Sequence, residues 1–156
     1  MASAAFWSYA LLVIASALLL YAAANDLRHF KIPNELVIVL AALFFAHAWF
    51  SGHWVHLHRN LLMAAAVFVF LVFAYNRAVL GGGDVKLLTV AFLWTGFDCA
   101  LPLAVLLTVF AAIHLGALKL GLVGARDDGQ RQRVPYAPVI AAALIGTFML
   151  GCLHPV

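Results

Sequence analysis

Two aspartates, Asp26 and Asp84, each lie beside a long apolar stretch that holds almost no other charge. A carboxylate at the boundary of a membrane is costly, so such a residue is a candidate functional group. Two carboxylates held close together cannot both ionise easily and tend to hold one proton between them. The ionised member can then take a proton from water while the protonated member hydrogen-bonds a carbonyl oxygen. The two residues therefore predict a paired-carboxylate active site, which requires no metal or other cofactor.

The segment after the first aspartate predicts a rigid corner. Asp26 is followed by Ile32, Pro33 and Asn34, and the proline fixes the backbone at its position. Asparagine is a favourable N-cap, so Asn34 is expected to cap the helix that follows. Such a corner would hold Asp26 in place. The alternative is that Asp26 simply ends the first helix at the membrane interface, next to basic headgroup anchors.

The second aspartate follows a run of glycines. The order is Gly81, Gly82, Gly83, Asp84, with Lys86 two positions later. Glycine permits backbone conformations closed to other residues and lets a second segment approach closely. Asp84 is thus expected at the start of a helix, near a wet pocket. The alternative is an ordinary connection between helices, with Asp84 as an N-cap.

The composition predicts the class of protein that must position these residues. Of 156 residues, 67% are hydrophobic and 10% are charged, and the mean hydropathy is +1.07. The chain has too little polar surface to cover a soluble globule. Its apolar runs are long and continuous, whereas strands of a membrane barrel have about 10 residues of alternating character. We expect an all-α integral membrane protein.

The apolar runs and their breakers predict a bundle of about six transmembrane helices, which form a single domain over residues 1–156. The expected spans are Ala4 to Asn25, Asn34 to Phe50, Leu61 to Leu80, Asp84 to Phe97, Ala100 to Leu122 and Pro138 to Leu153. The fourth span has only 14 residues (97 − 84 + 1), or about 21 Å of helix. A bilayer core is about 30 Å thick, so the glycine run is expected to dip below the interface.

The basic residues predict the orientation. If the N-terminus lies outside, eight fall on the cytoplasmic side and only Arg59 falls outside; the eight are Arg28, Lys31, Arg77, Lys86, Lys119, Arg126, Arg131 and Arg133. This is a strong positive-inside bias, and it places both aspartates at the cytoplasmic face. Topology and membrane lipids explain these charges, so no nucleic-acid partner is expected. The first span lacks the basic leading region of a signal peptide and is expected to be retained.

Three segments together resemble the type IV prepilin peptidases, within the wider GxGD group of intramembrane-type aspartic proteases. The segments are Asp26 with Ile32-Pro33-Asn34, then Gly81-Gly82-Gly83-Asp84-Val85-Lys86-Leu87-Leu88, then Val134-Pro135-Tyr136-Ala137-Pro138, in the family's order. The resemblance implies that Asp26 and Asp84 are the catalytic pair. It also implies a substrate, the basic leader of a pilin-like precursor, cut after a glycine just before its hydrophobic helix.

The chain departs from the longer members of that family. Those members also methylate the new N-terminus and carry a cytoplasmic domain with paired cysteine motifs. The two cysteines here, Cys99 and Cys152, cannot form a four-cysteine zinc site. We therefore expect a cleavage-only enzyme similar to the short Tad/Flp-pilus type, in the bacterial inner membrane with its active site facing the cytoplasm. Whether the two cysteines form a disulfide or remain as thiols is left open.

Two other functions fit the same carboxylates. A small ion or proton carrier would use them to bind or relay a cation, although a carrier needs carboxylates near the bilayer midplane. A non-enzymatic assembly subunit would use them as interface or capping residues. A metal site among His47, His53, His56 and His58 is a further alternative, but no cysteine or carboxylate in that connection completes a ligand set.

Other polar and aromatic residues are expected to have structural roles. Trp7, Trp49, Trp54 and Trp94 lie near proposed helix ends and predict an interfacial belt. Asp98 and His114 are isolated polar residues, and a satisfied structural role is expected for each.

Overall fold

The computed structural model describes residues 2–52, 57–77, 80–121, 126–127 and 132–151. Within them the chain forms α1 (Ala2–His29), α2 (Asn34–Ser51), α3 (Leu57–Asn76), α4 (Gly82–Thr95), α5 (Ala100–Lys119) and α6 (Ala137–Met149). Two short strands, β1 (Arg126–Asp127) and β2 (Gln132–Arg133), pair antiparallel between α5 and α6. The predicted all-α membrane fold is confirmed.

Four of the helices are long and apolar enough to cross a membrane: α2, α3, α5 and the Phe6–His29 part of α1. The other two are shorter, with 14 residues in α4 and 13 in α6. At 1.5 Å per residue they extend about 20 Å, well below the thickness of a bilayer core. The short fourth helix expected from the sequence is therefore present, and α6 is short as well.

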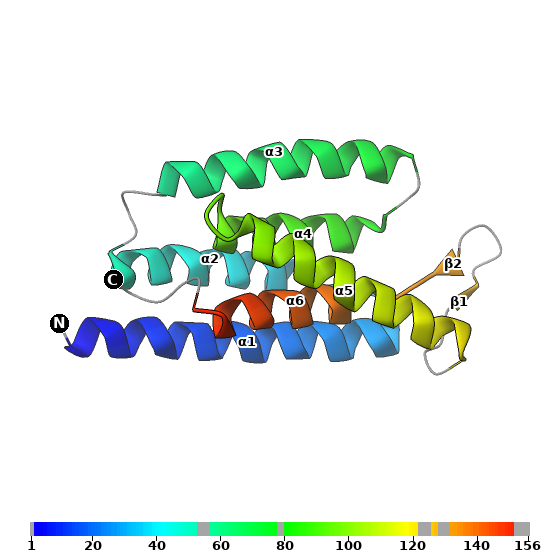
Figure 1. Cartoon of the computed structure of the whole chain (residues 1–156), viewed down its shortest axis with the longest axis horizontal. Coiled ribbons are helices and arrows are strands. Elements are labelled where there is room, and N and C mark those ends of the chain that lie inside the picture. The colour runs from blue at the N-terminus through cyan, green and yellow to red at the C-terminus, as the bar shows by residue number, and fades with distance from the viewer. Residues whose placement is uncertain (1, 53–56, 78–79, 122–125, 128–131, 152–156) are drawn as a thin grey trace.

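The two short helices lie inside the bundle. In Figure 1, α4 and α6 lie between α1 and α3. α4 packs against α2, α3, α5 and α6, while α6 also packs against α1 and α5. Among the described residues of α3, by contrast, only Ala64 and Leu71 are buried. Protein surrounds the two short helices. The backbone N–H and C=O groups at their ends can therefore find hydrogen-bond partners inside the protein and need not reach the membrane surface.

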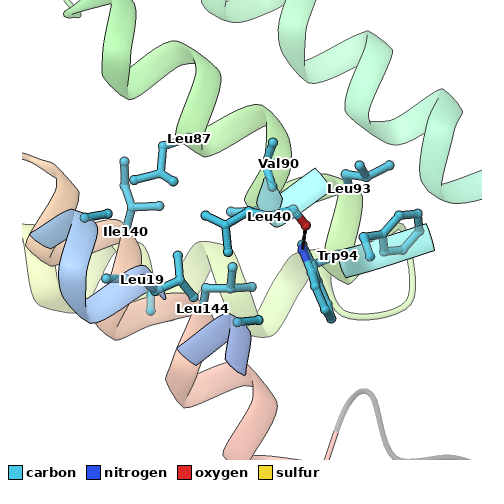
Figure 2. Packing of buried hydrophobic residues seen from close by; sticks show 14 of the residues in the cluster. Leu19, Leu40, Leu87, Val90, Leu93, Trp94, Ile140 and Leu144 are labelled. Carbon is cyan, nitrogen blue, oxygen red and sulfur yellow. Dashed lines mark hydrogen bonds between the residues drawn. The ribbon is translucent and has the colours of Figure 1, made fainter. Parts of the chain in front are cut away.

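The core joins the inner helices to α1 and α2. Figure 2 shows part of it, with Leu19, Leu40, Leu87, Val90, Leu93, Trp94, Ile140 and Leu144 labelled. Trp94 has no exposed surface, and its indole N–H donates to the carbonyl of Leu40 at 3.1 Å. The ring also lies against Phe44 and Phe148, so α4 is tied to α2 and α6.

The expected tryptophan belt is therefore wrong for one member. Trp94 is a core residue, because the end of α4 lies inside the protein and not at its lipid-facing surface. Trp7 is 53% exposed and Trp49 is 67% exposed, as a lipid-facing position requires. Trp54 lies outside the described residues.

Several helix boundaries differ from those expected. α1 continues to His29, so Asp26 lies in its last turn and does not begin a loop. No proline or glycine interrupts this stretch, and the helix ends only where Phe30 takes a left-handed conformation. α3 begins at Leu57, four residues before the expected Leu61. The polar residues Arg59 and Asn60, which were expected in the preceding loop, belong to its first turn, where their side chains bond Asp98 and the carbonyl of Leu93.

Polar contacts secure the end of the bundle where α3 begins. Arg59 forms an ion pair with Asp98 at 2.9 Å, which confirms a structural role for Asp98. The amide of Asn60 donates to the carbonyl of Leu93 at 3.1 Å. Cys99 is buried and disulfide-bonded, so of the two alternatives left open it does not remain a free thiol. Cys152 lies outside the described residues.

The four histidines weighed as a metal site have separate environments. His47 is buried and hydrogen-bonded to Ser8 at 2.9 Å. His53 and His56 fall outside the described residues, and His58 lies in the first turn of α3. Over the described ranges no three His, Cys, Asp or Glu side chains are grouped as a metal site would require.

Replacement of Trp94 tests this packing. Trp94→Phe removes the hydrogen bond to Leu40 and part of the buried ring, so we expect a loss of about 1–3 kcal/mol in the free energy of unfolding. Thermal unfolding in detergent micelles measures it. Trp7→Phe, at a position that is 53% exposed, is the matched control and should change stability little. Equal effects of the two variants would contradict a core role for Trp94.

Candidate active site

One pocket of about 950 Å³ collects the candidate residues. It lies at the end of the bundle where α1 and α3 end and α4 begins (Figure 1, right). All nine residues singled out from the sequence line it, namely Asp26, Ile32, Pro33, Asn34, Gly81, Gly82, Gly83, Asp84 and Lys86. The fold thus brings two segments that are far apart in the sequence to a single cavity.

Asp26 is held by the start of another helix. Its side chain is 6% exposed and accepts a hydrogen bond from the backbone N–H of Ala137 at 3.1 Å. Ala137 is the first residue of α6, and the first N–H groups of a helix have no partner within the helix. These groups also carry the positive end of the helix dipole. The beginning of α6 therefore satisfies the carboxylate and favours its negative charge.

Asp84 is held by the start of its own helix. It is the third residue of α4 and 8% exposed, and its carboxylate accepts the backbone N–H of Gly81. Gly81 occupies the N-cap position, so Asp84 provides one half of a capping box. The alternative weighed from the sequence, with Asp84 as the N-cap, is therefore wrong, because Gly81 occupies that position. The Asp84 carboxylate lies on the wall of the pocket that Asp26 also lines.

The glycine run provides space and not unusual backbone angles. Gly81 has φ −77° and ψ 149°, and neither Gly82 nor Gly83 is among the glycines with positive φ. A Cβ atom on Gly81 would meet Oδ2 of Asp84 at 2.8 Å, and one on Gly83 would meet Ile32 at 3.3 Å. On Gly82 the nearest atom is Cε2 of Tyr75 at an ordinary 3.6 Å. The expected close approach is confirmed, whereas the expected special conformation is wrong.

A lysine joins the two candidate segments. The Lys86 ammonium donates to Oδ1 of Asn34 at 2.8 Å, which links the second turn of α4 to the first residue of α2. Pro33 occupies the N-cap position of α2, and no side chain caps this helix. The prediction that Asn34 is the N-cap is therefore wrong. The Asn34 side chain instead connects the corner formed by Ile32, Pro33 and Asn34 to α4. Gly83 of α4 lies close to Ile32 of the same corner.

Asn25 and Phe30, which the sequence analysis did not single out, shape the corner and line the pocket. The Asn25 amide donates to the carbonyl of Lys31 at 2.7 Å and its oxygen lies 3.0 Å from Nδ1 of His29. Phe30 has φ 54°, a conformation that costs a non-glycine residue about 1–2 kcal/mol. Its N–H donates to the carbonyl of Asp26 at 2.9 Å. No sequence pattern distinguishes Phe30, because left-handed helix ends are usually glycine or asparagine.

The third segment of the family resemblance completes the pocket. Val134 and Tyr136 line it, and Pro135 is fully buried. Tyr136 precedes the first residue of α6, and Pro138 occupies the first turn, where its missing N–H costs nothing. This segment therefore sets the position of the Ala137 N–H that binds Asp26.

The arrangement can perform acid–base chemistry on a bound chain. Two nearly buried carboxylates lie on the wall of an open pocket, and the other ionisable residues that line it are His29, Lys31, Glu35, Tyr75, Lys86 and Tyr136. No group of side chains suited to a metal ion lies among the described residues. Carboxylates in an open pocket can exchange protons with water or with a bound chain.

The chain is similar to a known family and to a curated protein. The type IV leader peptidase family matches residues 13–121. A prepilin leader peptidase/N-methyltransferase of Bacillus subtilis (strain 168) is 31% identical over 149 residues, which cover 89% of this chain and 55% of the relative. The chain thus spans about half the length of the curated relative that it matches. No solved structure gives a significant match.

The three glycines are expected to respond differently to alanine. Gly81→Ala displaces the Asp84 carboxylate, and Gly83→Ala pushes Ile32 away, so each should lower the free energy of unfolding by about 1–3 kcal/mol. Gly82→Ala has room and should leave stability unchanged or raise it by up to about 1 kcal/mol, because alanine loses less backbone entropy on folding. Thermal unfolding in detergent measures all three. Equal losses of stability in all three variants would contradict this explanation and would show that the glycine run is needed for backbone flexibility and not for space.

Proposed function

Since the chain belongs to the type IV leader peptidase family, we propose that it is an aspartic endopeptidase that cleaves the basic leader from type IV, Flp-like prepilins. The observation that carries the proposal is the pairing of Asp26 and Asp84 on one pocket, each held by a backbone N–H at a helix start. A relative of the same family is named for prepilin leader cleavage.

In the proposed mechanism the two aspartates share one proton. The ionised carboxylate takes a proton from a water molecule, and the resulting hydroxide attacks the scissile carbonyl carbon. The protonated carboxylic acid donates a hydrogen bond to the carbonyl oxygen and stabilises the charge that develops there. The proton gained from water is then available for the leaving amine. Because both carboxylates titrate as one unit, activity should depend on the state of the pair and not on either residue alone.

The pocket is suited to an extended chain that enters from the membrane surface. We propose that the leader approaches from the cytoplasmic face of the bacterial inner membrane while the hydrophobic helix of the precursor stays in the bilayer. A pocket at one end of the bundle is reached from one side of the membrane. Glu35, which lines it beside the corner, is an acidic partner for a basic leader.

We propose that the protein cleaves the precursor but does not methylate the new N-terminus. The relative is named as a methyltransferase as well, but the sequence here has two cysteines and so cannot provide the four thiolates of a zinc site. The similarity to the short Tad/Flp-pilus type is the basis for proposing a Flp-like precursor.

The alternative function, a small ion or proton carrier, uses the same carboxylates. A carrier binds its ion near the bilayer midplane and opens to each side in turn. Asp26 lies in the last turn of α1, and Asp84 in the first turn of α4. Two carboxylates at helix ends favour a peptidase that works at one face.

Loss of either aspartate should abolish cleavage. Asp26→Asn and Asp84→Asn each keep the shape of the side chain but remove a group that acts in the transition state, so we expect a loss of at least about 10³-fold in cleavage rate. A Flp-type prepilin, co-expressed with each variant, should remain at its precursor size on a gel.

Asp98→Asn is the control for these variants, because Asp98 is paired with Arg59 away from the pocket. This variant should cleave normally. Substantial cleavage by either pocket variant would refute the assignment of the pair. Ion transport into liposomes by the purified wild-type protein, with the prepilin left intact, would instead support the carrier.

The proposed orientation can be tested separately. A reporter fused after Arg126 should behave as cytoplasmic, and one fused after His56 as periplasmic, because the basic residues then follow the positive-inside rule. Alkaline phosphatase, which is active only in the periplasm, and green fluorescent protein, which is fluorescent only in the cytoplasm, provide opposite readouts. The reverse pattern would place the pocket on the side that the leader does not reach.

A further inference from the structure

The two aspartates lie on helices that other elements hold together. Asp26 is in the last turn of α1, and Asp84 is in the first turn of α4. Over the described residues, α1 packs mainly against α2 and α6, whereas α4 packs against α2, α3, α5 and α6. The relative position of the two carboxylates is therefore set by elements that contact both helices, on the side of α6 and on the side of α2.

On the side of α6, the two aspartates are held by different donors. Ala137 at the start of α6 donates its N–H to Asp26. Asp84 is instead bonded by Gly81 at the start of its own helix. Between α6 and α4 the contact includes the apolar core. The polar bond from α6 thus fixes Asp26, and a second connection is needed to fix Asp84 relative to it.

His114 on α5 contributes to the position of α6 and not to this second connection. Its ring centroid lies 6.2 Å from that of Tyr136, the residue immediately before α6, and it does not line the pocket. It is 8% exposed, and its Nε2 atom makes no hydrogen bond to any residue that the structure describes. The satisfied structural role expected from the sequence is therefore wrong for His114.

On the side of α2, the corner formed by Ile32, Pro33 and Asn34 is firmly joined to the end of α1. The amide of Asn25, which belongs to α1, donates to the carbonyl of Lys31 at 2.7 Å, just before the corner. Pro33 has φ −61°, which its ring fixes. The corner is therefore expected to move as one piece with the last turn of α1, which carries the first aspartate.

The same corner is bonded to the helix that carries Asp84. The ammonium of Lys86 donates to Oδ1 of Asn34 at 2.8 Å. Close packing accompanies this bond, since a Cβ atom on Gly83 would come within 3.3 Å of Ile32. Lys86 follows Asp84 by two residues, so the bond lies within one helical turn of that carboxylate. It therefore joins the segment of one aspartate to the segment of the other.

Two other roles for Lys86 fit the structure less well. A headgroup anchor would extend its ammonium to the membrane surface, whereas this ammonium bonds a side chain that lines the pocket. A role in the stability of the whole fold would be expected of a buried bond, whereas this bond and both of its partners are exposed. A single exposed hydrogen bond contributes little to stability. The bond is thus better suited to fix local geometry.

We propose that Lys86 and Asn34 are a positioning pair, whose hydrogen bond holds the corner against α4 and thereby sets the separation of the Asp26 and Asp84 carboxylates. Neither member of the pair acts on the substrate. Two carboxylates share one proton only when they lie close together. A displacement of about 1 Å at a reacting centre can slow a reaction about 100-fold. The bond therefore acts on the rate of cleavage and leaves the binding of the leader nearly unchanged.

A double-mutant cycle tests the pair. Lys86→Met keeps an unbranched side chain without the ammonium, and Asn34→Leu keeps a similar shape without the acceptor. Cleavage of a Flp-type prepilin by the purified protein in detergent, measured as kcat and KM over a range of pH, is the readout. Each variant should lower kcat by about tenfold or more with KM nearly constant. The double variant should be no slower than the slower single variant, because both changes remove the same bond.

Two further readouts separate positioning from folding. Carboxylates that have moved apart titrate more nearly as independent groups, so the range of pH over which kcat is high should become narrower in each variant. Thermal unfolding in detergent should stay close to that of the wild type, because the lost bond is exposed. A loss of kcat that came with lower thermal stability and an unchanged pH range would overturn the proposal.

Conservative variants and a matched control complete the test. Asn34→Asp keeps an acceptor of the same shape, and Lys86→Arg keeps a cationic donor, so both should retain kcat near the wild-type value. Arg28→Met is the control, because Arg28 follows Asp26 by two residues, the same spacing as that of Lys86 from the other aspartate, but does not line the pocket. This variant should cleave normally. A loss equal to that of Lys86→Met would show that a nearby cation matters and not the bond.

Multiplied losses in the double variant would overturn the proposal, as would an Asn34→Leu variant that cleaves like the wild type. If Lys86→Met does not fold, the comparison of Asn34→Leu with Asn34→Asp decides alone. The inference rests on the proposed peptidase activity, and the two fail differently. A wild-type protein that leaves prepilin intact refutes the peptidase, whereas pair variants that cleave like the wild type refute only the positioning role.

Discussion

The structure depends on one constraint, which is that two carboxylates must remain almost buried in a protein that has very few polar groups. In such surroundings a carboxylate without donors would be too costly to keep. Helix starts solve the problem, because their first N–H groups have no partner within the helix. Asp26 uses the start of α6, and Asp84 uses the start of α4. The donors come from the backbone, so no additional polar side chain has to enter the core.

This solution requires α4 and α6 to lie inside the bundle. At the surface of the bundle, the first N–H groups of a helix would face the surroundings and not a buried carboxylate. The start of α6 instead bonds Asp26 in the last turn of α1, and the start of α4 lines the pocket. With 14 and 13 residues, both helices are also short. The long helices α1, α2, α3 and α5 then cover them. Trp94 secures this arrangement, since its N–H reaches the carbonyl of Leu40 in α2 from within the core.

Much of this arrangement could be predicted from the sequence, because it follows from composition and from conspicuous residue types. Hydrophobicity predicted the helical membrane fold, and two short motifs predicted nine residues that line one pocket. The missed features depend on tertiary contacts. Asn34 looked like an N-cap but bonds Lys86, and Trp94 looked interfacial but lies in the core. The left-handed Phe30 carries no local signal at all.

The environments of the two aspartates differ in a way that bears on their roles. Asp84 and its donor Gly81 belong to the same helix start, so their bond forms whenever α4 forms. Asp26 depends on two further elements, namely the corner at Phe30 and the start of α6. Its environment therefore exists only when α1 and α6 have packed together. In the proposed peptidase, this dependence would keep a partly folded chain from cleaving neighbouring membrane proteins.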